Sequence, residues 1–352
     1  MSNNRIRWID ATKGLLILLM VLGHIHNIAG KHGIQDDYLI KCTFFSSLYS
    51  CFFMQAFLVL TGYTSNFEKK IKLFLVSQLK TIVIPWFVFS VLCQIYRGAS
   101  GDHSFFININ NQNFFFLFED FWFLHVIFFG KLFYYFVFKY IGNDIVRASL
   151  LLLMMVSGFA IFTFYKDSGN TYHYYNYLHY KDFLCMTFFL WFGNFSRRKE
   201  IFKYLKGRIL IIIIFLYIIG HAFRLYFRLN DIDDTLIAPV ILSHGGNAMS
   251  LVQIPAYIYY VILGSLSCFG IMQYIGNCRF LEYFGLNSLV VYCVHFVFLA
   301  LLVEFIGSII SPDNIVSALV YTILTLFSCL LSCVVVIQIT KHKPFNFLIG
   351  KF

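Results

Sequence analysis

Long apolar runs separated by short polar connectors extend along almost the whole chain. A helix needs roughly 20 mostly apolar residues to cross a hydrocarbon core of about 30 Å. The pattern therefore predicts about ten membrane-spanning helices. Their expected limits are 9–29, 44–66, 74–96, 121–141, 147–165, 181–195, 208–228, 249–272, 284–306 and 315–339.

These runs have the character of helices rather than strands. Residues 209–219 are apolar on every face, whereas a membrane β-barrel needs alternating segments of about ten residues. The longest connectors, 97–120 and 229–248, do not form a separate soluble domain. We therefore expect an all-α polytopic membrane bundle, with residues 1–352 forming a single membrane-embedded domain.

The composition narrows the class of protein further. The chain is 59% hydrophobic and 12% charged, against about 45–50% and about 25% in a typical soluble domain. This composition excludes a cytosolic enzyme with one compact core and a disordered chain. It also argues against a nucleic-acid partner despite the net charge of +10. The expected partner is a lipid bilayer.

The distribution of positive charge predicts the orientation, because cytoplasmic loops are enriched in Lys and Arg. Most of these residues share one side with the N-terminus, including Arg5, Arg7, the lysines in 69–72 and the basic loop 197–208. Most acids fall in the opposite connectors, including Asp36, Asp37, Glu119, Asp120, Asp231, Asp233 and Asp234. Both termini are therefore expected in the cytoplasm. The loop 197–208 could alternatively attract an anionic ligand.

Neither a cleaved leader nor a cysteine-based site is predicted. The first run lacks a small-residue cleavage pattern and is interrupted by Asp10, Lys13 and His24, which favours an uncleaved helix. The nine cysteines form no CxxC or metal-ligand spacing. We expect no disulfide framework, no metal site and no bound cofactor.

Three polar residues in the first run call for an explanation, because a charged residue in a membrane helix costs a few kcal/mol. Asp10, Lys13 and His24 share one helix face. His24 lies roughly 16 Å beyond Lys13 along the axis. Asp10 is therefore expected to pair with Lys13, whereas His24 needs a partner on another helix or in a water-filled cavity. A neutral, structural histidine is the alternative.

A second polar group falls in the ninth run. Ser288, Tyr292 and His295 follow at i, i+4 and i+7 and so share one helix face. They are expected either to line a cavity or to hold two helices together through hydrogen bonds. Trp122, at the start of the fourth run, could stack on a sugar ring or belong to an interfacial aromatic belt.

Several short motifs resemble the acyltransferase-3 family of integral membrane acyltransferases, in particular its branch resembling fucose 4-O-acetylases. The opening match is the segment WIDATKG at 8–14, followed by His24. The strongest later match is FGLNS at 284–288, leading to Tyr292 and His295. Between them lie LTGY at 60–63, IPW at 84–86, FWFL at 121–124 and FG at 192–193.

The resemblance implies an enzyme that transfers groups other than amino-acyl groups. Such an O-acyltransferase, most often an O-acetyltransferase, moves an acyl group from cytoplasmic acyl-CoA, here acetyl-CoA, to a carbohydrate acceptor. The acceptor would be a hydroxyl of a cell-surface or secreted polysaccharide. His24 is assigned as the general base, since a histidine titrates near pH 6.5. A covalent acyl-histidine intermediate is the less favoured variant.

The chain departs from the family in its third run. Family members often carry an RxxR pair before the proline of that helix, and this sequence lacks it. Lys69 and Lys72, or Lys80 five residues before Pro85, could supply the charge, although lysine lacks the planar fork of arginine. We assign Lys13 and Lys80 to binding the phosphates of CoA at the cytoplasmic end of the helices. Asp10 is assigned to the same donor-binding site.

Two other classes are weighed against the enzyme. A polysaccharide or small-solute transporter would also carry polar groups in its helices, but it is expected to show inverted repeats with paired broken helices. No such pair is visible in the two halves of the sequence. A haem-binding electron carrier would use His24 and His295 as axial ligands.

Overall fold

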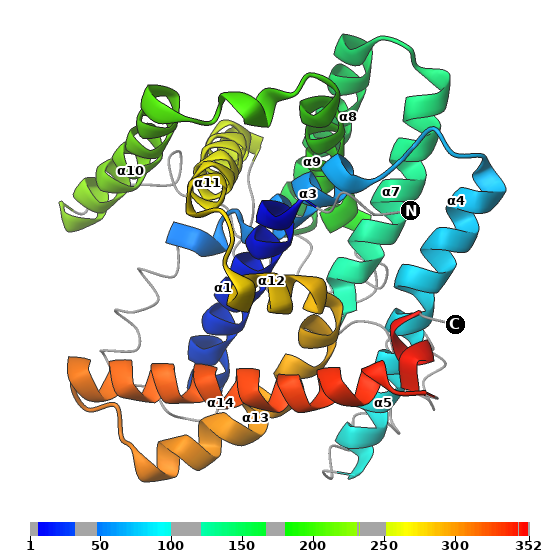
Figure 1. Ribbon diagram of the computed structural model, residues 1–352. Helices are drawn as coiled ribbons and strands as arrows, with labels where there is room; N and C mark the ends of the chain where they lie inside the picture. Colours follow the sequence, from blue (N-terminus) through cyan, green and yellow to red (C-terminus); the bar gives the residue numbers. More distant parts are fainter. Residues whose placement is uncertain are drawn as a thin grey trace. The chain divides into compact units, whose positions relative to one another are not determined.

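The computed structural model describes residues 6–31, 48–99, 121–166, 180–230, 232, 251–343 and 345–350 (Figure 1). Within these ranges the regular structure is helical throughout, with no strand, which confirms the all-α prediction. The residues form two compact units. The first takes the described residues within 1–60, 196–246 and 252–337, and the second takes those within 61–195, 247–251 and 338–352.

The first unit contains the helices from both ends of the sequence. They are α1 (Arg7–Lys31), most of α3 (Phe53–Thr64), the 3-10 turn η3 (Ile201–Tyr204), α10 (Gly207–Leu229), α11 (Ile254–Ile275), α12 (Arg279–Leu286), α13 (Ser288–Ile309) and most of α14 (Ile315–Lys341). The second unit contains the central helices. They are α4 (Ile71–Gln78), the π-helix η1 (Leu79–Val83), α5 (Ile84–Ala99), α7 (Trp122–Tyr140), α8 (Asp144–Lys166), most of α9 (Tyr180–Arg198) and the 3-10 turn η5 (Phe345–Ile349). A further 3-10 turn, η4 (Leu251–Gln253), directly precedes α11.

Among the described residues, 8 helical segments are long and apolar enough to cross a membrane. They are Arg7–Gly30, Ile71–Tyr96, Trp122–Tyr140, Asp144–Ile161, Gly207–Phe227, Leu251–Ile275, Ser288–Ile309 and Ile315–Lys341. Each corresponds to a predicted run. The predicted run 44–66 begins outside the described residues and continues as the shorter apolar helix Leu48–Thr64. The predicted run 181–195 lies inside α9, whose ends carry charged residues. The count of ten and the cytoplasmic termini remain predictions.

Helices α1 and α12 pack backbone against backbone in the first unit (Figure 1). Two glycines make this approach possible. A Cβ atom on Gly14 would overlap the carbonyl of Leu281, and a Cβ atom on Gly285 would overlap the carbonyl of Asp10. The amphipathic α12 also forms an ion pair with α1, since Arg7 Nε lies 3.5 Å from Glu282 Oε2. The two motif segments of the sequence are thus joined directly.

The ninth predicted span begins four residues before the helix that the structure shows there. We expected one span from residue 284, but the structure ends α12 at Leu286 and begins α13 at Ser288. Asn287 separates them with φ −112° and ψ 17°, and its side-chain Nδ2 donates to the Tyr283 carbonyl at 2.8 Å. An asparagine that bonds its own backbone competes with helix continuation, which explains the break.

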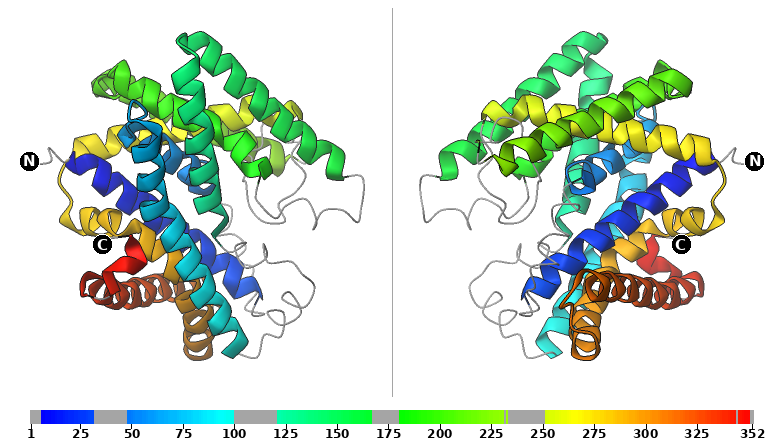
Figure 2. Two further views of the ribbon diagram at one scale, coloured as in Figure 1. Left: turned by 90° about the vertical axis from the view of Figure 1, so that its right-hand side faces the viewer. Right: turned by 90° about the vertical axis from the view of Figure 1, so that its left-hand side faces the viewer.

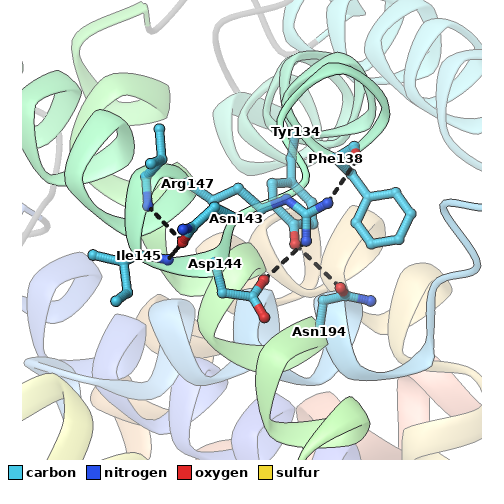
Figure 3. Close-up of polar contacts among 8 residues, drawn as sticks. Tyr134, Phe138, Asn143, Asp144, Ile145, Arg147 and Asn194 are labelled. Atoms are coloured by element: carbon cyan, nitrogen blue, oxygen red, sulfur yellow. Dashed lines mark hydrogen bonds and ion pairs between the residues drawn. The ribbon is translucent and has the colours of Figure 1, made fainter.

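The turn between α7 and α8 is fixed by polar side chains of the second unit (Figure 3). Asn143 Oδ1 accepts a 2.8 Å hydrogen bond from the Ile145 N–H and so caps α8. Arg147 pairs with Asp144 at 2.8 Å and donates to the Phe138 carbonyl at 2.8 Å, while its guanidinium lies over the Phe138 ring. Arg147 is 5% exposed. Arg147 therefore stabilises the turn through these contacts. Its charge also counts among those that predict the orientation in the membrane.

The third predicted span is helical but irregular. Residues Leu79–Val83 form a π-helix between α4 and α5. Pro85 has no N–H to offer the Thr81 carbonyl, and the Ile84 N–H bonds the Leu79 carbonyl five residues back. The turn η5 packs against α5, and a Cβ atom on Gly350 would overlap the Lys80 carbonyl. Lys80 thus lies on a locally widened helix.

Candidate functional site

The rings of His24 and His295 lie together in the first unit. His24 comes from α1 and His295 from α13, and their ring centroids are 5.3 Å apart with an interplanar angle of 37°. The Phe296 ring also lies near His24, with ring centroids 5.9 Å apart. The structure thus brings the histidine of the opening motif next to the histidine of the last motif, which lies on a different helix.

The hydrogen bonds of His295 define its tautomer. Its Nδ1 lies 3.0 Å from the Val291 carbonyl oxygen and 2.8 Å from the Tyr292 carbonyl oxygen. Carbonyl oxygens only accept hydrogen bonds, so Nδ1 carries the proton of the neutral ring and Nε2 carries the lone pair. Nε2 is buried and has no hydrogen-bond partner among the described residues, and the side chain is 4% exposed. His295 therefore presents a hydrogen-bond acceptor that no described residue uses.

The other predicted residues of α13 lie close to this pair. The ring centroid of Tyr292 is 6.2 Å from that of His295, and Tyr292 is buried. Ser288 is half-buried at the first position of α13, two turns before His295. The Cys329 thiol of α14 contacts the His295 backbone carbonyl, with Sγ 3.8 Å from the oxygen. This contact joins α14 to α13 at the position of His295.

Asp10 and Lys13 lie on the first two turns of α1, several turns from His24. Both side chains are half-buried. The Asp10 backbone carbonyl forms part of the glycine contact with α12 described above. The expected Asp10–Lys13 ion pair stays a prediction.

Lys80 and Trp122 belong to the second unit, whereas the six other predicted site residues belong to the first. Lys80 is exposed on the π-helix. Trp122 is half-buried at the first position of α7, with its ring centroid 5.8 Å from that of Phe123. Each is found on the helix where it was predicted.

Sequence reasoning missed a histidine in the second unit. His125 of α7 is fully buried, and its ring centroid lies 3.8 Å from that of Trp86 on α5. Trp86 follows the proline of the third-span motif, and His125 lies one turn after Trp122. The i, i+3 spacing of Trp122 and His125 was the available signal.

It also missed a polar face in the first unit. Tyr217, His221 and Arg224 of α10 are all buried, although the run that contains them reads as lipid-facing. Their i, i+4, i+7 spacing is the same signal that identified Ser288, Tyr292 and His295. It was not used because the surrounding isoleucines dominate the run.

The arrangement of the two histidines is suited to proton transfer. Among the described residues, no group of three or more His, Cys, Asp or Glu could hold a metal ion. An imidazole can accept a proton near neutral pH. A second imidazole beside it, with a lone pair that accepts a hydrogen bond, can stabilise the resulting positive charge. The fold and this pair define a polytopic helical membrane protein with a histidine site between its first helix and α13.

A comparison with known protein families identifies the family of this chain. The family model described as an acyltransferase domain, Acyl_transf_3, matches residues 6–336. The chain belongs to this acyltransferase-3 family. It is an integral membrane acyltransferase, an enzyme that transfers groups other than amino-acyl groups. No curated protein and no solved structure shows a significant match to the chain.

Proposed function

We propose that the protein is an O-acetyltransferase of a bacterial cytoplasmic membrane. It moves the acetyl group of cytoplasmic acetyl-CoA to a hydroxyl of a cell-surface or secreted polysaccharide, as the likeness to fucose 4-O-acetylases suggests. The observation that carries the proposal is the contact between His24 and His295, at a ring-centroid separation of 5.3 Å. Two groups that can take up and release protons thus lie together on helices that are mostly apolar.

His24 is the general base of the proposed reaction. As the acceptor hydroxyl attacks the thioester carbonyl, its proton passes to the His24 imidazole and a C–O bond forms. The C–S bond then breaks, and the CoA thiolate takes the proton from His24. General bases of this kind contribute about 10²–10⁴-fold to a rate. No acyl-histidine intermediate is required, because the hydroxyl can attack the thioester directly.

His295 positions His24 in this mechanism. Two imidazoles joined by an N–H···N hydrogen bond have ring centroids roughly 5 Å apart, given a donor–acceptor distance of about 3 Å. The observed 5.3 Å matches that separation. The separation is compatible with a hydrogen bond from a His24 N–H to the His295 Nε2 lone pair. The bond would stabilise the imidazolium that forms when His24 takes the proton.

The remaining predicted residues have binding roles. Lys13 and Lys80, each in its own unit, supply positive charge for the phosphates of CoA, with Asp10 setting the orientation of Lys13. Ser288 and Tyr292 offer hydroxyl groups on the face of α13 that carries His295. They can donate to the oxyanion of the thioester carbonyl. Trp122 provides a ring face for the sugar.

Mass spectrometry of surface glycans, with and without the gene product, tests the proposal. Cells that express the protein should carry glycans heavier by one acetyl group, and the mass difference should disappear in cells that express His24→Ala at equal abundance. His26→Ala is the matched control, because His26 lies on the same helix and points nearly opposite to His24. Retained acetylation in the His24→Ala cells would refute the role of His24, and a glycan mass independent of the gene would refute the proposed reaction.

A further inference from the structure

Phe296 of α13 is accessible on a helix face where its neighbours are buried. Tyr292, Leu299 and Val303 lie within about 60° of Phe296 around the helix axis, because successive residues are about 100° apart. These three side chains are 9%, 0% and 0% exposed, whereas Phe296 is 38% exposed. The packing against this face of α13 is therefore open at Phe296.

The outward-facing side chains of α13 lie elsewhere on the helix. Leu301, Phe305 and Ile309 are all more than half exposed. They lie about 140–180° from Phe296 around the helix axis. These exposed apolar residues have the character of a stripe that faces lipid. The accessibility of Phe296 therefore does not come from that stripe but from the opposite side of the helix.

The accessible ring lies beside both histidines of the candidate site. The centroid of Phe296 is 5.9 Å from that of His24 and 6.2 Å from that of His295, with interplanar angles of 75° and 86°. Helices α1 and α13, which carry the three rings, pack against each other in the first unit (Figure 2). His295 is buried and His24 is half-buried, so Phe296 is the most exposed of the three rings. A substrate group that approaches the histidines from the accessible side meets Phe296.

The reacting carbonyl lies close to His24 in the proposed reaction. The acceptor oxygen is within about 3 Å of the base and about 3–3.5 Å from the carbonyl carbon, which places that carbon no more than about 6.5 Å from the base nitrogen. The acyl chain extends from this carbon and needs room in the same region. The Phe296 ring lies at a similar distance from His24. It is therefore close enough to limit the space for the chain.

We propose that Phe296 determines the length of the acyl group that the enzyme accepts. The acyl chain of the donor lies against the ring, which leaves room for an acetyl group and excludes longer chains. Discrimination of this kind in an apolar pocket is about 10–200-fold for one methylene group. The inference rests on the proposed function, because it takes an acyl-CoA as the donor. Phe296 acts through its shape and takes no part in proton transfer.

Binding of donor analogues that cannot be transferred tests the proposal on the purified full-length protein. The probes are analogues of acetyl-CoA and butyryl-CoA in which a methylene group replaces the thioester sulfur, and calorimetry gives the Kd of each. The wild type should bind the acetyl analogue at least tenfold more tightly than the butyryl analogue. Phe296→Ala should bring the two Kd values close together. Phe305→Ala is the matched control, because it removes the same ring from the exposed side of the same helix and should keep the wild-type ratio.

Two further variants keep the test decisive if Phe296→Ala does not fold. Phe296→Leu removes part of the ring and should narrow the difference between the two Kd values, whereas Phe296→Trp adds volume and should weaken binding of the acetyl analogue several-fold. A wild type that binds both analogues equally, or a ratio that none of these variants changes, would overturn the proposal.

The transfer assay separates this proposal from the proposed function. A Kd ratio that depends on Phe296 in a protein that transfers no acetyl group would support the acyl-length role and refute the reaction. Acetyl transfer by a protein whose Kd ratio does not depend on Phe296 would refute the acyl-length role alone.

Discussion

Gly14 and Gly285 meet directly: a Cβ atom on Gly285 would lie 2.9 Å from the Gly14 backbone nitrogen. The contact joins the opening motif, on α1, to the last motif, on α12. Because α13 begins two residues after α12 ends, this crossing also determines where His295 lies relative to His24. The two glycines therefore act on the histidine pair through the backbone, without touching either ring.

Gly285→Ala should destabilise the protein strongly. The added methyl group would overlap the Asp10 carbonyl, which is backbone and cannot rotate away. Overpacking of this kind costs about 1–3 kcal/mol or more. We expect a lower unfolding temperature in detergent. Gly23→Ala is the matched control on α1, because its Cβ atom would meet Tyr49 at an ordinary 3.6 Å. An equal unfolding temperature for Gly285→Ala and the wild type would contradict this packing.

His295→Ala should lower kcat about 10–100-fold with little change in KM for acetyl-CoA. The reason is the loss of a hydrogen bond to a charged group, worth about 1.5–3 kcal/mol. His295→Gln, which keeps an acceptor oxygen, should recover part of the rate. A purely structural His295 would instead lower the amount of folded enzyme and leave kcat per folded molecule unchanged.

Arg147→Gln should destabilise the turn between α7 and α8. It removes a buried ion pair with Asp144 and a hydrogen bond to the Phe138 carbonyl (Figure 3). Breaking a buried pair costs about 3 kcal/mol. The exposed pair of Lys203 and Glu200 offers the comparison, since Lys203→Gln should change stability by less than about 1 kcal/mol. Thermal unfolding of the two variants side by side measures the difference, and equal effects would refute the anchoring role of Arg147.

Lys80→Ala should raise KM for acetyl-CoA about tenfold and leave kcat nearly unchanged, because a phosphate contact contributes to binding alone. Lys80→Arg should retain the wild-type KM. Lys206→Ala changes an exposed lysine of the basic loop 197–208 and should have no effect. A raised KM in Lys206→Ala with a normal KM in Lys80→Ala would instead assign donor binding to that loop.

The sequence was sufficient to predict the helices, because runs of isoleucine and leucine can satisfy their backbone in a membrane only as helices. It could not place the break at Asn287, since a single polar residue after FGL is compatible with a continuing helix. It could not foresee the π-helix at Lys80 either, which depends on how the Thr81 carbonyl responds to Pro85.

The candidate site was predictable one helix at a time. The position of His24 implied a partner elsewhere, and the i, i+4, i+7 pattern marked the face of α13 that carries His295. Their pairing depends on the crossing of α1 and α12 at Gly14 and Gly285, which no periodicity within one helix reveals. Arg224 was overlooked because burial of a cation is a property of the packed helices and not of the apolar run around it.

The most direct test of the central claim is acetyl transfer by purified protein in proteoliposomes, with acetyl-CoA outside and a polysaccharide acceptor supplied. Transfer of the acetyl group to the acceptor is measured for the wild type, His24→Ala and His26→Ala at equal protein content. We predict transfer by the wild type and by His26→Ala, and a rate at least 100-fold lower for His24→Ala. A His24→Ala rate equal to that of the wild type would contradict the assignment of His24 as the base.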